Sequence, residues 1–202
     1  MRSFESEDAE ICDAFKREGL SIQSLWDLLN RNDYQKMVPF LVDFLAKAEN
    51  DKTYEGIARA LTMKGLDNSV TIALTQRIQR PMDDGTAWVF GNAISITATE
   101  KNFEDVLQLL SNPSLGSGRK MLCECLGRIG KKQKDRTFNA LQLLLADPDL
   151  VGQVVCGFYK LGDPRAIELI RPYLTHEHRW ISKKTAATIK KLEKILEKPN
   201  GK

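Results

Sequence analysis

The chain has 202 residues, 42% of them hydrophobic and 28% charged, and its formal net charge is +3. This length suffices for one domain with a sizeable core. No apolar run is long enough to cross a bilayer, and the acidic start MRSFESEDAEICDAF lacks the apolar core of a signal peptide. These features argue against a membrane-spanning or secreted protein, so we expect a cytoplasmic location and no membrane contact.

The first 32 residues precede any repeated pattern and are expected to form one or two capping helices. Their apolar positions are Phe4, Ile11, Phe15, Leu25, Trp26 and Leu29. Since the ends of a stack of repeats would otherwise expose an apolar face, a terminal segment must cover it.

A thirteen-residue pattern then returns five times, at 53–65, 86–98, 118–130, 150–162 and 181–193. The copies begin 33, 32, 32 and 31 residues apart. A period in this range is typical of an α-solenoid, in which each repeat is a helical hairpin that buries its apolar face against its neighbours. The sequence therefore predicts an all-α fold, an α-solenoid of about five helical hairpins with an N-terminal helical cap.

The copies agree where packing between helices would demand it. The ninth residue is large and apolar: Leu61, Ile94, Leu126, Phe158 and Ile189. The sixth residue is small or short: Ala58, Gly91, Cys123, Val155 and Ala186. This spacing predicts a buried stripe on each helix, with small residues that let a neighbouring helix approach closely. Three copies end in Gly65, Gly130 and Gly162, where a helix end favours the left-handed conformation.

A further amphipathic segment precedes each copy, at about 37–48, 70–79, 103–110, 137–146 and 165–174. In the last segment the apolar residues expected to be buried are Ile167, Ile170 and Leu174. Asp163 followed by Pro164 is a typical helix start, because Asp accepts hydrogen bonds from free N–H groups and Pro suits the first helical position. No stretch alternates with a period of two, so we expect no sheet.

The segment FYKLGDPRAIELIRPYL, residues 158–174, resembles the HEAT repeat, in particular the short bacterial HEAT-like repeat of the phycobilisome-lyase type. That type ends one helix in a Leu-Gly-Asp turn and opens the next with Pro-Arg-Ala. Pro39 and Pro172 match prolines that often kink HEAT first helices, and Arg119 matches an early arginine of the pattern. The resemblance covers about residues 33–197, extends to small uncharacterised bacterial HEAT-repeat proteins, and implies a fold rather than a function.

We therefore expect capping helices at residues 1–32 and a HEAT-like repeat region at 33–202, all in one structural domain. The predicted repeats are about 33–65, 66–99, 100–131, 132–162 and 163–197.

The two halves of the chain differ in charge. Residues 1–100 hold 11 Lys and Arg against 16 Asp and Glu, a net charge of −5, and residues 101–202 hold 19 against 11, a net charge of +8. Much of the excess lies in the last predicted helix, at Lys183, Lys184, Lys190, Lys191, Lys194 and Lys198. We expect these lysines to form a solvated cap; the alternative is a basic docking surface for an acidic protein or nucleic acid.

In HEAT-like stacks the second helices line the concave face, which implies a binding ridge made by their exposed positions. The predicted ridge residues are Arg59, Trp88, Asn92, Lys120, Glu124, Arg128 and Tyr159. Aromatic and arginine side chains are enriched at protein interfaces. The alternative for Trp88 is burial between two repeats.

Catalytic and metal-ligating patterns are poor. Cys123 and Cys125 lie two apart on a helix and do not face each other, so packing explains them better than metal binding. His176 and His178 lack the four-residue spacing of helix-mounted zinc motifs. We therefore expect no metal, no cofactor and no enzymatic activity.

The favoured hypothesis is a monomeric, non-catalytic scaffold that binds a protein partner on its concave ridge. One alternative is a nucleic-acid-binding protein similar to the helical-repeat DNA repair glycosylases, in which Trp88, Lys120, Glu124 and Arg128 would line the groove; the acidic N-terminal half argues against it. A second alternative, a bilin-lyase-like protein, rests only on the repeat type.

Overall fold

The structure is a computed structural model that describes residues 2–197, and within this range every regular element is helical and no strand occurs. The helices form two compact units. The first unit runs to Ala98 and includes Ser114–Gly118; the second comprises Thr99–Pro113 and continues from Arg119. The all-α prediction is confirmed. That residues 33–202 form one domain stays a prediction.

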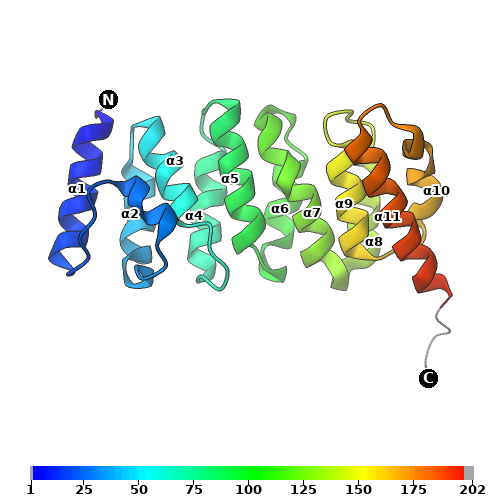
Figure 1. The fold of residues 1–202 in the computed structure, drawn as a ribbon, viewed down its shortest axis with the longest axis horizontal. Helices are drawn as coiled ribbons and strands as arrows, with labels where there is room; N and C mark the ends of the chain where they lie inside the picture. Colours follow the sequence, from blue (N-terminus) through cyan, green and yellow to red (C-terminus); the bar gives the residue numbers. More distant parts are fainter. Residues whose placement is uncertain (1, 198–202) are drawn as a thin grey trace, which may run out of the picture. The chain divides into compact units, whose positions relative to one another are not determined.

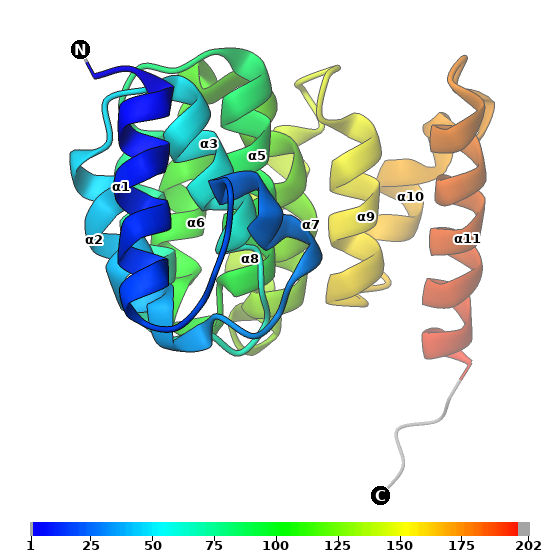
Figure 2. The ribbon, with the colours of Figure 1, turned by 60° about the vertical axis from the view of Figure 1, so that its left-hand side comes forward.

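The first unit contains five α-helices, α1 (Phe4–Arg17), α2 (Val38–Lys47), α3 (Asp51–Ala60), α4 (Asn68–Ile78) and α5 (Asp84–Thr97). Two 3₁₀ helices, Leu25–Asn30 and Gln35–Met37, connect α1 to α2. Helices α2 and α4 pack against each other, and so do α3 and α5, which gives two rows of helices in contact (Figure 1). Both α1 and the 3₁₀ helix Leu25–Asn30 contact α3, on the side turned forward in Figure 2.

A buried carboxylate ties α1 to the start of α3. Glu7 in α1 is 0% exposed, and its oxygens accept hydrogen bonds from the backbone N–H groups of Glu49, at 2.8 Å, and Asn50, at 3.3 Å. Hydrogen bonds to an ionised acceptor are the stronger kind, and a buried carboxylate needs such partners. An acidic residue in an amphipathic helix is normally read as exposed, so the sequence did not suggest this role.

The second unit contains six α-helices, α6 (Phe103–Leu110), α7 (Lys120–Ile129), α8 (Lys134–Leu144), α9 (Val151–Leu161), α10 (Ala166–Ile170) and α11 (Arg179–Leu196). Short 3₁₀ helices lie at Glu100–Asn102, Gly130–Gln133 and Arg171–Thr175, and a further one, Pro113–Arg119, precedes α7. Helices α7, α9 and α11 form one row, in which α9 contacts both others (Figure 1). Helix α6 packs on α7, α8 packs on α7 and α9, and α10 packs on α11.

The repeated pattern marks α3, α5, α7, α9 and α11, and its ninth position is buried in every copy. Leu61, Ile94, Leu126 and Phe158 are 0% exposed, and Ile189 is 6% exposed. The prediction of a buried stripe is confirmed. A large apolar side chain recurs at the ninth position of the pattern. The second helix of each repeat therefore turns the same apolar face toward the core of its unit.

Small residues allow backbones to touch. A Cβ atom on Gly127 in α7 would lie 2.0 Å from the carbonyl oxygen of Gly157 in α9, and one on Gly157 would lie 2.6 Å from that of Cys123. In the first unit, a Cβ on Gly91 would lie 2.0 Å from the carbonyl oxygen of Gly118. No side chain larger than hydrogen fits such distances. The close approach predicted at the small sixth residue is therefore confirmed at Gly91.

Three details of the predicted pattern are wrong. Leu174 is 39% exposed, because α10 ends at Ile170 and the chain tightens into the 3₁₀ helix Arg171–Thr175, which turns Leu174 away from the core. Gly130 has φ −87°, and the chain continues from it into a 3₁₀ helix; a Cβ there would instead collide with Thr137. Ala186 is exposed, since no described helix follows α11 to cover its sixth position.

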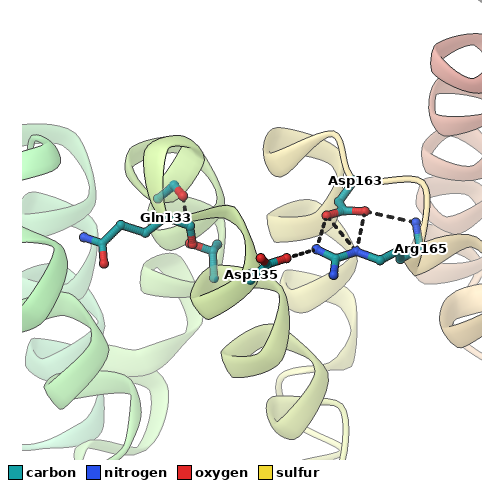
Figure 3. Close-up of polar contacts among 6 residues, drawn as sticks. Gln133, Asp135, Asp163 and Arg165 are labelled. Carbon is teal, nitrogen blue, oxygen red and sulfur yellow. Dashed lines mark hydrogen bonds and ion pairs between the residues drawn. The ribbon is translucent and has the colours of Figure 1, made fainter.

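Residues that carry the HEAT resemblance, Gly162, Asp163 and Arg165, stabilise the turn between α9 and α10. Gly162 has φ +70° and ends α9, as predicted. Asp163 accepts from the backbone N–H of Arg165 at 3.1 Å, and the Arg165 guanidinium bonds both Asp163, at 2.6 Å, and Asp135 of α8, at 2.7 Å (Figure 3). The same guanidinium lies over the ring of Phe138, 4.4 Å from its centre. Regular helix begins at Ala166, two residues later than the Asp-Pro pair suggested.

Candidate binding surfaces

Three of the predicted ridge residues lie in the first unit, on α3 and α5. Trp88 is 39% exposed, so part of its surface faces solvent, and the alternative that it packs between two repeats stays open. Asn92 follows one turn later on α5 and is half-buried. On α3, the guanidinium of Arg59 bonds the Glu55 carboxylate at 2.8 Å and remains exposed. Exposed positions of α3 and α5 thus combine a large aromatic ring with polar groups.

The other four predicted residues lie in the second unit. Lys120, Glu124 and Arg128 follow one another at intervals of four on α7 and so share one face of that helix. Glu124 forms an ion pair with Lys160 of α9 at 3.0 Å, and Arg128 donates to the sulfur of Cys125 at 3.6 Å. Since α7 and α9 are in contact, this face continues from one helix to the next.

Tyr159 in α9 is covered by two lysines of α11. The ammonium of Lys184 lies 4.3 Å from the centre of the Tyr159 ring, and that of Lys191 lies 3.9 Å away. Lys191 also donates to the backbone carbonyl of Tyr159 at 2.5 Å. Cations over an aromatic face are attracted by its quadrupole. Lys184 and Lys191 therefore pack on the protein instead of extending as a solvated cap, and Lys198 lies outside the described residues.

Two further lysines approach this pair, and we call Lys131, Lys160, Lys184 and Lys191 the lysine cluster. Burial lowers the pKa of Lys191, and the charges of Lys131, Lys160 and Lys184 lower it further. Repulsion of this kind requires that the four ammonium groups share one region of the second unit. Among the described residues, the carboxylate that pairs with the cluster is Glu124.

The lysine cluster was missed as a site, although the sequence contained a signal for it. Position eleven of the repeated pattern is Arg128, Lys160 and Lys191 in the last three copies, whereas it is Met63 and Ile96 in the first two. A basic residue at the same position of successive second helices predicts a row of positive charge. Cys156, which lies in the same region, is only 8% exposed and is not part of the exposed surface.

The second unit also has an apolar cavity of about 500 Å³ between α6 and α8. Its apolar walls are Leu107, Leu110, Ala140, Leu143 and Leu144. The two arginines that line it already have acidic partners, Asp147 for Arg119 at 2.8 Å and Glu104 for Arg136 at 2.6 Å. None of the predicted ridge residues lines this cavity.

Groups for metal binding are not assembled in the described part of the chain, where no three His, Cys, Asp or Glu side chains could hold an ion. The rings of His176 and His178 stack on each other, 5.5 Å apart, in the turn before α11. Within residues 2–197, no helix combines the length and the apolar character that a membrane crossing needs.

Comparison with known proteins finds no relative. The chain matches no protein-family model, no curated protein and no solved structure. The resemblance to HEAT repeats therefore rests on sequence features alone, which are the repeat period, residues 158–174 and the matches at Pro39 and Arg119.

Proposed function

We propose that this chain is a HEAT-like helical-repeat scaffold without catalytic activity, which binds a protein partner on the exposed side of its second helices. The observation that carries the proposal is Trp88. Its ring is 39% exposed on α5, while Phe90 and Ile94 on the same helix are 0% exposed. Trp88 thus reaches the surface of a helix whose large apolar residues Phe90 and Ile94 are buried. An exposed tryptophan beside polar groups is the typical anchor of a protein interface.

The test is site-specific photo-cross-linking in the native cell. A benzophenone amino acid replaces Trp88 in one variant and Ile72 in the control. Ile72 is a matched position because it is 43% exposed but lies on α4, in the other row of the first unit. We expect a discrete partner protein to cross-link at position 88 and not at position 72. Equal cross-linking from both positions would contradict the proposal.

Affinity for the captured partner provides the quantitative test. Trp88→Ala is expected to weaken binding about 30-fold, which corresponds to the roughly 2 kcal/mol of a typical anchor residue. Ile72→Ala should leave the affinity unchanged, and circular dichroism should show both variants folded. A partner that binds Trp88→Ala as tightly as the wild type does not use this ridge.

The solenoid is also part of the proposal. It is supported by the contacts between successive second helices within each unit, α3 with α5, α7 with α9 and α9 with α11. A compact globule of this length has a radius of gyration of about 17 Å. We expect small-angle X-ray scattering to give a clearly larger value, because a stack of repeats is elongated. A value near that of the globule would contradict a solenoid.

We further propose a cytoplasmic location. Its support is the cysteine usage, since Cys12, Cys123, Cys125 and Cys156 are all free thiols in the described residues. Free thiols are the rule in reducing compartments. A fluorescent fusion in the native cell tests this, and an extracytoplasmic signal would contradict it.

A further inference from the structure

A row of cations crosses three helices of the second unit. It consists of Arg128 in α7, Lys160 in α9 and Lys191 in α11, all at position eleven of the repeated pattern. Because α9 contacts both α7 and α11, these three residues lie on successive neighbouring helices. Neighbouring helix axes are about 10 Å apart, so the row is roughly 20 Å long.

We propose that the lysine cluster, with Arg128, binds the sugar–phosphate backbone of a nucleic-acid double helix without selecting the base sequence. A row of about 20 Å equals the axial length of roughly six base pairs, since successive phosphates of one strand are 3.4 Å apart along the axis. The proposal uses residues of the second unit only, and it does not depend on the protein partner proposed above.

The charges of the cluster favour an anionic ligand. The four lysines of the cluster lie close enough for their charges to act on Lys191, and Lys160 is paired with the Glu124 carboxylate. Like charges held close together repel one another, and a polyanion that lies across them relieves this repulsion. The excess of positive charge in residues 101–202, 19 Lys and Arg against 11 Asp and Glu, acts in the same direction.

The residue types favour nucleic acid over an acidic protein. Lysine is depleted in protein interfaces, where Trp, Tyr and Arg provide the anchors. The aromatic ring of Tyr159, which lies inside the cluster, already carries two ammonium groups at 4.3 Å and 3.9 Å and is half-buried. It cannot receive an unpaired base, as single-strand binding proteins require. What the cluster offers is positive charge held in place on the protein surface, and such charge suits regularly spaced phosphates.

The test is fluorescence anisotropy with a labelled 20-base-pair duplex DNA of arbitrary sequence, at a series of salt concentrations. If four lysines each neutralise one phosphate, the slope of log K against log salt is about −3.6. Affinity should then fall about 100-fold between 50 and 200 mM salt. A second duplex of unrelated sequence should bind equally well, and a single strand of the same length should bind more weakly.

Single-residue variants test whether duplex binding depends on the lysine cluster or on the overall positive charge of the chain. Lys160→Ser and Lys191→Ser should each reduce the magnitude of the slope by about 1. Lys183→Ser is the matched control, since Lys183 is an exposed lysine of α11 outside the cluster, and it should leave the slope unchanged. Glu124→Gln removes the acidic partner of Lys160 and should tighten duplex binding several-fold. If Lys160 had only a structural role, Glu124→Gln would leave the affinity for duplex DNA unchanged.

Three outcomes would overturn the proposal. They are no duplex binding at 50 mM salt, equal losses for Lys183→Ser and Lys191→Ser, and tighter binding of a polyglutamate peptide than of duplex DNA, which would identify an acidic protein as the ligand. Circular dichroism and the melting temperature confirm folding of each variant, and Lys191→Arg, which keeps the charge, should retain binding.

Discussion

At the scale of single residues, the conspicuous polar groups of this protein connect helices. Glu7 holds the start of α3, and Arg165 links Asp163 to Asp135 of α8. The motif that suggested a HEAT-like repeat is thus explained by local structure. The Asp-Pro-Arg order places an acceptor and a guanidinium two residues apart, where they bond each other and a neighbouring helix.

The Asp163 network predicts a pH dependence of stability. Burial alone would raise the pKa of the Asp163 carboxyl, but hydrogen bonds from the guanidinium and the backbone N–H of Arg165 outweigh it, so the pKa is lower than usual. A carboxyl with a lowered folded-state pKa stabilises the fold above its unfolded-state pKa of about 3.9, and this stabilisation is lost as the pH falls through the folded-state value.

Asp163→Asn should therefore cost about 1–3 kcal/mol at pH 7 and lose less stability than the wild type between pH 5 and pH 3. Urea denaturation at several pH values measures both effects. Asp135→Asn is the control, because Asp135 pairs with the same Arg165 but its side chain is 83% exposed, so its effect should be small. Equal effects of the two variants would show that burial of Asp163 does not matter.

At the scale of helices, periodicity made the second helices predictable. The large residue at the ninth position marks the buried side of each of these helices. The predictions for Leu174 and Gly130 were wrong, because a shift from α-helix to 3₁₀ helix leaves little mark on a short sequence. The lysine cluster was not predicted as a site. Its members come from α9, α11 and the segment after α7; position eleven signals Lys160 and Lys191, whereas Lys131 and Lys184 join them through the packing of these elements.

Leu126→Ala tests the buried stripe. Leu126 lies in α7 and is 0% exposed, so the substitution should cost about 2–5 kcal/mol, the range for large-to-small changes in a core. Urea denaturation followed by circular dichroism measures the loss. Leu143→Ala is the matched control, because Leu143 is 78% exposed on α8 and should change stability by less than about 0.5 kcal/mol. Similar losses for both variants would contradict the assignment of the stripe.

At the scale of the whole chain, the two compact units should respond separately to local damage. Gly91 and Gly127 offer matched changes, since a Cβ on either would lie 2.0 Å from a backbone oxygen of its own unit. In repeat proteins, the effects of a mutation are greatest for the nearest neighbours. Gly91→Ala should speed amide hydrogen exchange mainly in α3–α5, and Gly127→Ala mainly in α7–α11.

Hydrogen exchange with mass spectrometry of peptides from both units measures this difference. The control is Ala187→Gly in α11, at an exposed position, which should affect only its own helix. A uniform rise of exchange along the whole chain after Gly91→Ala would show that the two units open as one.

The rate at which the buried cysteines are chemically modified reports how often the second unit opens. Cys123 and Cys125 are 0% and 2% exposed, and burial raises their pKa values to about 12 and about 11. The thiolate is the form that attacks an alkylating reagent, so both cysteines are protected twice, by lack of access and by protonation. Their modification by iodoacetamide should therefore proceed only as fast as α7 separates from its neighbours. The natural chain thus reports its own unfolding rate without any added label. Leu126→Ala should increase the rate at which iodoacetamide modifies these cysteines.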